Sequence, residues 1–169
     1  MQTFLPFDNF DKVAKHLDWI RLGKQRVEAK QILYCLEQPN RWIHHPAVQM
    51  WKGHKSALTE YMNAMIREWV VRGYKNNMPI IKVHTLVPEK PKWIGDPEIH
   101  RSHRMMLVWK SINDFLEKGK RVNFDWYKQF GWAEEYIGNL DSFTGYIWPV
   151  EIKDYKPKKR LEIPEELWN

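Results

Sequence analysis

The sequence predicts a mostly α-helical protein, a compact helical single domain with aromatic-rich loops. Two observations favour this class. Apolar residues recur at three- and four-residue intervals along most of the chain. The chain has 169 residues, which suits one domain large enough to bury a core. It also has 10 tryptophans, and we expect most of them to pack at the edges of that core.

The first helical stretch follows Asp8 or Asn9, either of which is a good N-cap before Phe10. Apolar spacing continues to Leu36 with an irregularity at Gly23. The pattern predicts one long helix kinked at Gly23 or two short helices. The lone cysteine of this stretch, at position 35, follows the helical spacing and is predicted to be a structural, buried residue.

The later helices are more sharply bounded. Pro46 is a good first helical residue. Residues 58–69 follow helical spacing, and Gly73 is a natural stop for that helix. The last long helix is predicted over residues 98–118, before Gly119. Between these two long helices, residues 74–97 are expected to be irregular, with a short extended piece at residues 80–83.

The rest of the chain reads as aromatic loops followed by a tail. We assign residues 1–150 to the domain and residues 151–169 to a peripheral C-terminal tail or oligomer contact, because that stretch turns from basic to acidic. The net charge of +6 favours an anionic partner. No apolar run is long enough to cross a bilayer, no signal peptide is visible and there is one cysteine, so we expect a cytoplasmic protein.

The densest polar cluster is residues 21–28, Arg-Leu-Gly-Lys-Gln-Arg-Val-Glu. On a helix, Lys24 lies one turn from Glu28, and Arg21 lies one turn from Gln25. A solvated helix face with an ion pair explains this pattern as well as a functional site does.

Histidines form a second candidate group. His100 and His103 are three residues apart, a spacing that can share a metal ion, but a closed site needs two more ligands and we predict no metal. With His45 and Arg104, they are expected either to contact phosphate and base edges or to be buried against the backbone. Further on, Trp126 and Tyr127 precede Lys128, a pattern that suits stacking on unpaired bases or plugging the core.

Three motifs occur in order along most of residues 1–150. They are His16-Leu17 with a basic cluster ending at Arg26-Val27, then Arg41-Trp42-Ile43-His44-His45-Pro46, then Trp93-Ile94-Gly95-Asp96-Pro97 with His100 to Arg104 and Trp126-Tyr127-Lys128-Gln129-Phe130-Gly131. With these motifs the chain resembles the pyrimidine-dimer DNA glycosylase family of the phage endonuclease V type, in particular an uncharacterised bacterial and phage subgroup.

The resemblance implies a compact helical fold and a DNA repair enzyme that cuts the N-glycosidic bond of a damaged or modified pyrimidine and then the DNA backbone, an AP-lyase step, without a metal or other cofactor. It implies that the N-terminal α-amine attacks C1′ of the sugar and forms a Schiff base. Here that amine is expected to belong to Met1, with Lys24 as the second candidate. An α-amine has a pKa of about 8, so part of it is nucleophilic near neutrality.

The family also has a helix carboxylate in an Arg-Glu pair, and that pair falls on Lys24-Gln25 in this sequence. An amide cannot act as a carboxylate base. Glu28, nearly one turn further on, or Asp18 is expected to replace it, with Gln25 as a polar partner. If the carboxylate is simply missing, Gln25→Glu should restore cleavage.

The expected partner is duplex DNA with a damaged or modified base, in a bacterial or phage-infected cell, with no membrane. We expect the DNA contacts to come from His16, Arg21, Arg26, His45, His100, His103, Arg104, Trp126, Tyr127 and Lys128. Two other functions stay open: a catalytically silent DNA-binding protein on the same scaffold, and an enzyme that acts on a modified nucleotide.

Overall fold

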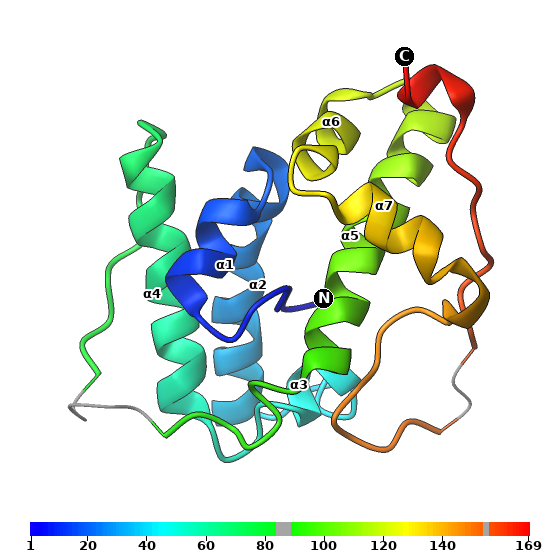
Figure 1. Ribbon diagram of the computed structural model, residues 1–169. Helices are drawn as coiled ribbons and strands as arrows, with labels where there is room; N and C mark the ends of the chain where they lie inside the picture. Colours follow the sequence, from blue (N-terminus) through cyan, green and yellow to red (C-terminus); the bar gives the residue numbers. More distant parts are fainter. Residues whose placement is uncertain (84–88, 154–155) are drawn as a thin grey trace.

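A computed structural model describes residues 1–83, 89–153 and 156–169 of the chain (Figure 1). Within these ranges, seven α-helices and two short 3-10 helices form all of the regular structure, and no strand occurs, which confirms the predicted fold class. The α-helices are α1 (Phe10–His16), α2 (Trp19–Glu37), α3 (Pro46–Gln49), α4 (Lys55–Val71), α5 (Pro97–Lys118), α6 (Val122–Lys128) and α7 (Trp132–Gly138).

The first helical stretch divides at Leu17 and Asp18, not at Gly23. Asn9 caps α1 by accepting a hydrogen bond from the Lys12 N–H, and the Asp18 side chain caps α2 in the same way. Gly23 lies inside α2, where an added Cβ would come within 3.0 Å of the Trp69 ring on α4. The glycine therefore serves the close packing of α2 on α4, which lie side by side in Figure 1.

Several other helix boundaries agree with the sequence prediction. Pro46 is the first residue of α3, and α4 ends shortly before Gly73. The α5 helix is capped at its start by Asp96 and at its end by Gly119, which has the left-handed φ of 65° that glycine adopts without strain.

Two short helices replace loops that we expected after residue 119. Helices α6 and α7 have 7 residues each and pack on α5. Helices this short gain little from their own hydrogen bonds, so they depend on buried aromatic residues. Phe124, Tyr127 and Tyr136 are fully buried here.

The extended piece at residues 80–83 is not a strand. Its backbone is fixed by the Asn63 side chain, whose Nδ2 donates to Ile81 O at 2.7 Å and whose Oδ1 accepts from the Ile81 N–H at 3.1 Å.

The described part of the tail lies along the domain. Trp109 Nε1 donates to Lys159 O at 2.8 Å, and Leu167 is fully buried.

Candidate active site at the N-terminus

The N-terminal segment, residues 1–6, passes through the interior of the protein between α2 and α5 (Figure 1). Gln2 to Leu5 are buried. A buried chain end must have its backbone groups satisfied, and here side chains from other elements satisfy them. The segment is thus fixed in place and its first residue is presented at a defined position.

His100 and His103 of α5 hold the segment at Leu5. The Leu5 N–H donates to His103 Nδ1 at 3.2 Å, and His100 Nδ1 lies 2.7 Å from Leu5 O. The Gly95 N–H donates to His100 Nε2 at 2.9 Å, so Nδ1 carries the proton that bonds Leu5 O. Arg104 holds Pro6 O at 2.9 Å.

These contacts favour a structural role over a DNA contact for all three expected residues. His103 is fully buried, and burial, with the charge of His100, lowers its pKa to about 3, so its ring is neutral. The Arg104 guanidinium is also bound by both oxygens of Glu135 at 2.7 Å. Within the described ranges, no group of three or more His, Cys, Asp or Glu side chains is placed to bind a metal ion.

Gln25 holds the same segment further toward the terminus and is fully buried. Its Oε1 accepts from the Phe4 N–H at 3.0 Å and lies 2.6 Å from the Tyr61 hydroxyl. Its Nε2 donates to Gln2 O at 2.9 Å and to Glu28 Oε2 at 3.1 Å. All four hydrogen-bonding positions of the amide are used, and this pattern needs a glutamine.

Glu28 lies next to the chain terminus. Its Oε2 accepts from the Gln2 N–H at 3.0 Å as well as from Gln25 Nε2. Its Oε1 has no hydrogen-bond donor among the described residues and the side chain lines a cleft. The i,i+4 pairs expected from the sequence, Lys24 with Glu28 and Arg21 with Gln25, do not form, because Glu28 and Gln25 turn inward to the N-terminal segment.

A cleft of about 760 Å³ opens at this point, and all four expected catalytic residues line it. One wall is a face of α2 and the opposite wall is a face of α5; the N-terminus lies at one side. The lining from these three elements is Met1, Gln2, Phe4, Ile20, Arg21, Lys24, Gln25, Glu28, Met106, Trp109, Lys110, Asn113, Asp114, Glu117 and Lys118.

The two candidate amines differ in their surroundings. The α-amine of Met1 makes no ion pair or hydrogen bond with any described residue, although Met1 is half-buried and its neighbour Gln2 is bonded to Glu28. Lys24 is exposed at the rim, one helical turn from Glu28. The backbone next to Met1 is thus fixed by a hydrogen bond to the Glu28 side chain.

An aromatic corner completes the cleft near the N-terminus. The His45 ring is 6.5 Å from the Trp148 ring, which is 5.5 Å from Tyr146. The Ala47 N–H donates to His45 Nδ1 at 3.1 Å, so the neutral ring carries its proton on Nε2. Burial and the positive charge of the N-terminal amine lower the pKa of His45, which keeps it neutral near pH 7.

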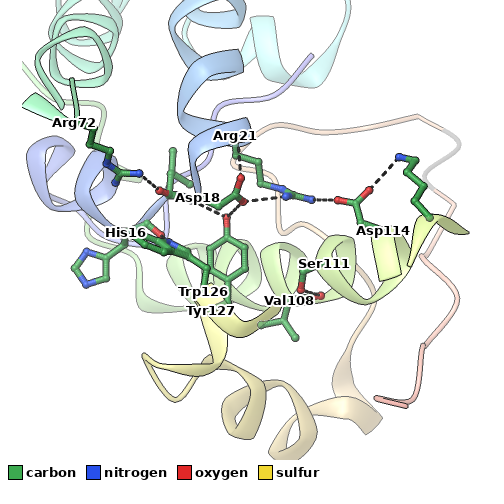
Figure 2. A network of polar contacts seen from close by, with 11 residues as sticks. His16, Asp18, Arg21, Arg72, Val108, Ser111, Asp114, Trp126 and Tyr127 are labelled. Atoms are coloured by element: carbon green, nitrogen blue, oxygen red, sulfur yellow. Dashed lines mark hydrogen bonds and ion pairs between the residues drawn. The ribbon is translucent and has the colours of Figure 1, made fainter. Parts of the chain in front are cut away.

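Arg21 lines the cleft but is engaged by two carboxylates (Figure 2). Its Nη1 lies 2.9 Å from Asp18 Oδ2 and its Nη2 lies 2.8 Å from Asp114 Oδ2. The Tyr127 hydroxyl donates to Asp18 Oδ2 at 2.5 Å. Burial, reinforced by the Asp18 charge, raises the pKa of Tyr127, so the phenol stays protonated. This network joins α2, α5 and α6, and Tyr127 is fully buried in it.

The remaining expected DNA contacts lie away from the cleft. Trp126 donates to His16 O at 2.8 Å (Figure 2), and His16 is in ring contact with Phe130. Arg26 stacks on Trp69 with its guanidinium 4.1 Å from the ring centroid. Lys128 Nζ donates to Trp168 O at 3.0 Å.

Sequence reasoning missed several residues of the cleft. Lys110 follows the helical spacing of the α5 face, but no motif marks it. The basic run of the tail was visible in the sequence, and its Lys156 and Lys158 line the cleft instead of being peripheral. Tyr146 and Trp148 lie in the aromatic loop after α7, which was not assigned a site.

Of the helices in the described ranges, none has the length and apolar character needed to span a membrane.

Comparisons with known proteins found a match for the N-terminal part of the chain. A search of curated proteins found no match, and neither did a search of solved structures. One family model, described as Pyrimidine dimer DNA glycosylase, matches residues 1–82. This range holds Met1, Lys24, Gln25, Glu28 and His45, whereas the motifs between residues 93 and 131 lie outside it. Residues 1–82, just under half of the chain, are thus similar to the pyrimidine dimer DNA glycosylase family.

Proposed function

We propose that the protein is a DNA glycosylase with AP-lyase activity, acting on a damaged or modified pyrimidine, and that the α-amine of Met1 is its nucleophile. One observation carries the proposal. Residues 2–6 are buried and bonded at nearly every backbone group, so that Met1 is delivered beside a carboxylate in a cleft. Chain ends are usually poorly ordered unless they are tied down, and here the contacts of residues 2–6 bring Met1 to the cleft.

The chemistry requires a target nucleotide extruded from the duplex into the cleft. The amine nitrogen forms a bond to C1′ of the sugar while the N-glycosidic bond breaks, and the base leaves with the bonding electrons and takes up the proton that the amine loses. Ring opening gives a protonated Schiff base. Loss of a C2′ proton then drives β-elimination, in which the C3′–O bond breaks and the 3′ phosphate leaves with that electron pair.

Each residue near Met1 has a role in this sequence. Glu28, with Oε1 unoccupied by any described donor, is the group that stabilises the positive charge developing at C1′ and accepts the proton from the attacking amine. The neutral His45 carries an Nε2–H that can donate a hydrogen bond to the leaving base. Gln25 is a positioning residue that holds Gln2 and Glu28 in register.

Base release from a duplex carrying pyrimidine dimers tests the proposal, and it is measured after photochemical reversal of the dimer, because a dimerised base stays joined to its neighbour when its N-glycosidic bond breaks. Glu28→Gln keeps the acceptor for the Gln2 N–H but removes the charge, so it should lower the rate of base release by about 100-fold or more. Glu117→Gln is the matched control, because Glu117 is an exposed carboxylate in the same cleft; its rate should match the wild type.

Three outcomes contradict the proposal. Equal rates for the wild type and Glu28→Gln would remove Glu28 from the chemistry. Duplex binding without base release would indicate a DNA-binding protein. Turnover of a free modified nucleotide, with none of the duplex, would indicate a nucleotide enzyme.

A further inference from the structure

Near the N-terminal end of α2, the cleft has more positive side chains than the carboxylates around them neutralise. Arg21 is matched by Asp18 and Asp114, and Lys118 shares Asp114 at 3.2 Å. Lys110 and Lys158 remain without a carboxylate bonded to them in the described ranges, and both line the cleft.

Lys110 is the unusual member of this pair. It lies on the α5 wall and is half-buried. Burial is the main cause that lowers its pKa, and the charges of Arg21 and Lys158 lower it further, against smaller opposite effects of Glu28 and Asp114. A half-buried ammonium beside two other cations is costly unless an anion joins it.

Lys158 is fixed against the same wall. Its backbone N–H donates to Thr144 O at 3.0 Å, and its Nζ lies 5.6 Å from the centroid of the Trp109 ring. Trp109 is in turn bonded to the backbone of Lys159 at 2.8 Å. The Trp109 indole thus anchors the tail to α5, and the anchored tail places the charge of Lys158 in the cleft.

We infer that Lys110 and Lys158 form a phosphate subsite that binds a backbone phosphate flanking the nucleotide presented to Met1. The inference rests on the proposed function for the source of the phosphate. A nucleotide within a strand has phosphates on both sides of its sugar, and a sugar held at Met1 and Glu28 places one of them along the same cleft. A phosphate there restores the charge balance that Lys110 lacks.

The first test needs no DNA. Sulfate stays a dianion across the range in which lysines titrate, so the protein with ¹³C-labelled lysines is titrated by NMR with and without it. The Lys110 resonance, identified by its loss in Lys110→Arg, should titrate at higher pH when sulfate is present. The exposed Lys52, which lies outside the cleft, should not respond. No response of Lys110 overturns the inference.

The second test identifies the source of the phosphate. Lys110→Gln and Lys158→Gln should each weaken binding to a duplex with a reduced abasic site by roughly tenfold and flatten the dependence of log affinity on log salt by about 0.9. Lys52→Gln should change neither. A neutral methylphosphonate at the contacted phosphate should make the wild type and Lys110→Gln bind alike.

Unchanged duplex affinity in both variants overturns the inference. It is also overturned if the two variants lose affinity for thymidine 5′-monophosphate, offered as a free ligand, but keep their affinity for the duplex. Because Lys110→Gln removes a costly buried charge, its melting temperature should equal or exceed the wild type, which separates lost binding from lost folding. A sulfate response in a protein that releases no base contradicts the proposed function and leaves the anion subsite standing.

Discussion

At the scale of single residues, the key relation is between Gln25 and Glu28. The family resemblance puts a catalytic carboxylate at position 25, and the sequence has an amide there. The structure gives the physical reason: the Gln25 Nε2 must donate to both Gln2 O and Glu28 Oε2, and a carboxylate has no proton to donate. A carboxylate lies instead at position 28, about one helical turn further along α2, beside the N-terminal segment.

Gln25→Glu is therefore expected to damage the protein and not to restore a missing activity. The new carboxylate would face Glu28 Oε2 and Gln2 O, two acceptors, in a fully buried position. We expect a loss of roughly 2–4 kcal/mol in the free energy of unfolding, measured by denaturant titration at pH 7.

The exchange variant Gln25→Glu/Glu28→Gln supplies the control, because the amide at position 28 can donate to the carboxylate at position 25. It should recover part of the lost stability, a coupling that a double-mutant cycle measures. Equal stability of Gln25→Glu and the wild type would show that the Gln25 contacts do not hold the N-terminal segment.

At the scale of elements, the structure depends on how α5 holds the N-terminal segment through His100 and His103. The buried, neutral His103 ties this contact to pH. Its pKa is about 3 in the folded protein, below the ordinary value of 6.5. The unfolded state thus binds more protons between these values, and the stability conferred by the neutral ring is complete above pH 6.5 and is lost as pH falls toward 3.

The free energy of unfolding should fall on acidification below pH 6.5 by up to about 1.4 kcal/mol per pH unit from this residue. His103→Asn can keep the bond to the Leu5 N–H through its Oδ1 and has no ring to protonate, so its stability should depend less on pH over this window. His44→Asn, at an exposed position, should keep the wild-type slope. Parallel curves for His103→Asn and the wild type would contradict the assignment.

The sequence predicts the elements unevenly, and the reasons are physical. Helix α5 carries two caps and a long amphipathic pattern, and α4 has a similar pattern that ends before Gly73, so local information suffices for both. Helices α6 and α7 are too short to be stable alone, and their buried rings are explained only by packing on α5. Helices α1 and α2 separate at Asp18, because its side chain caps α2. Gly23 does not interrupt the helix; it allows α2 to pack closely on Trp69 of α4.

The candidate site also contains residues that the sequence predicts and residues whose role only the fold explains. Met1, Lys24, Gln25 and Glu28 are predicted through the family resemblance, because the Arg-Glu pair of the family falls on Lys24-Gln25, Glu28 is a nearby carboxylate and Met1 carries the amine. The roles of His103 and Arg104 depend on backbone atoms of Leu5 and Pro6, 98 residues away. No local pattern reports contacts across such a separation, and the sequence alone therefore leaves both a DNA contact and burial against the backbone open.

At the scale of the whole molecule, only some of the side chains behind the net charge of +6 are free to attract a partner. Arg21 and Arg104 are neutralised by carboxylates inside the fold. Lys24 and Lys120 are exposed, have no carboxylate partner in the described ranges and line the cleft. Attraction for DNA should therefore come from lysines at the rim of the cleft.

Duplex affinity should fall as salt increases, and Lys24→Gln or Lys120→Gln should each flatten the slope of log affinity against log salt by about 0.9. Arg104→Gln should lower the melting temperature with little effect on that slope, because its charge is held by Glu135. Fluorescence anisotropy over a salt series measures the slopes. An affinity independent of salt, or a flatter slope for Arg104→Gln alone, would contradict this distribution of charge.

The claim on which the rest depends is that the Met1 amine is the nucleophile, and borohydride trapping on an abasic duplex tests it directly. The account predicts a covalent adduct on the N-terminal peptide, unchanged in Lys24→Arg and abolished when the terminus is acetylated, because an amide nitrogen does not form a Schiff base. An adduct on Lys24, an adduct that survives acetylation, or no adduct with a protein that binds the duplex would contradict it.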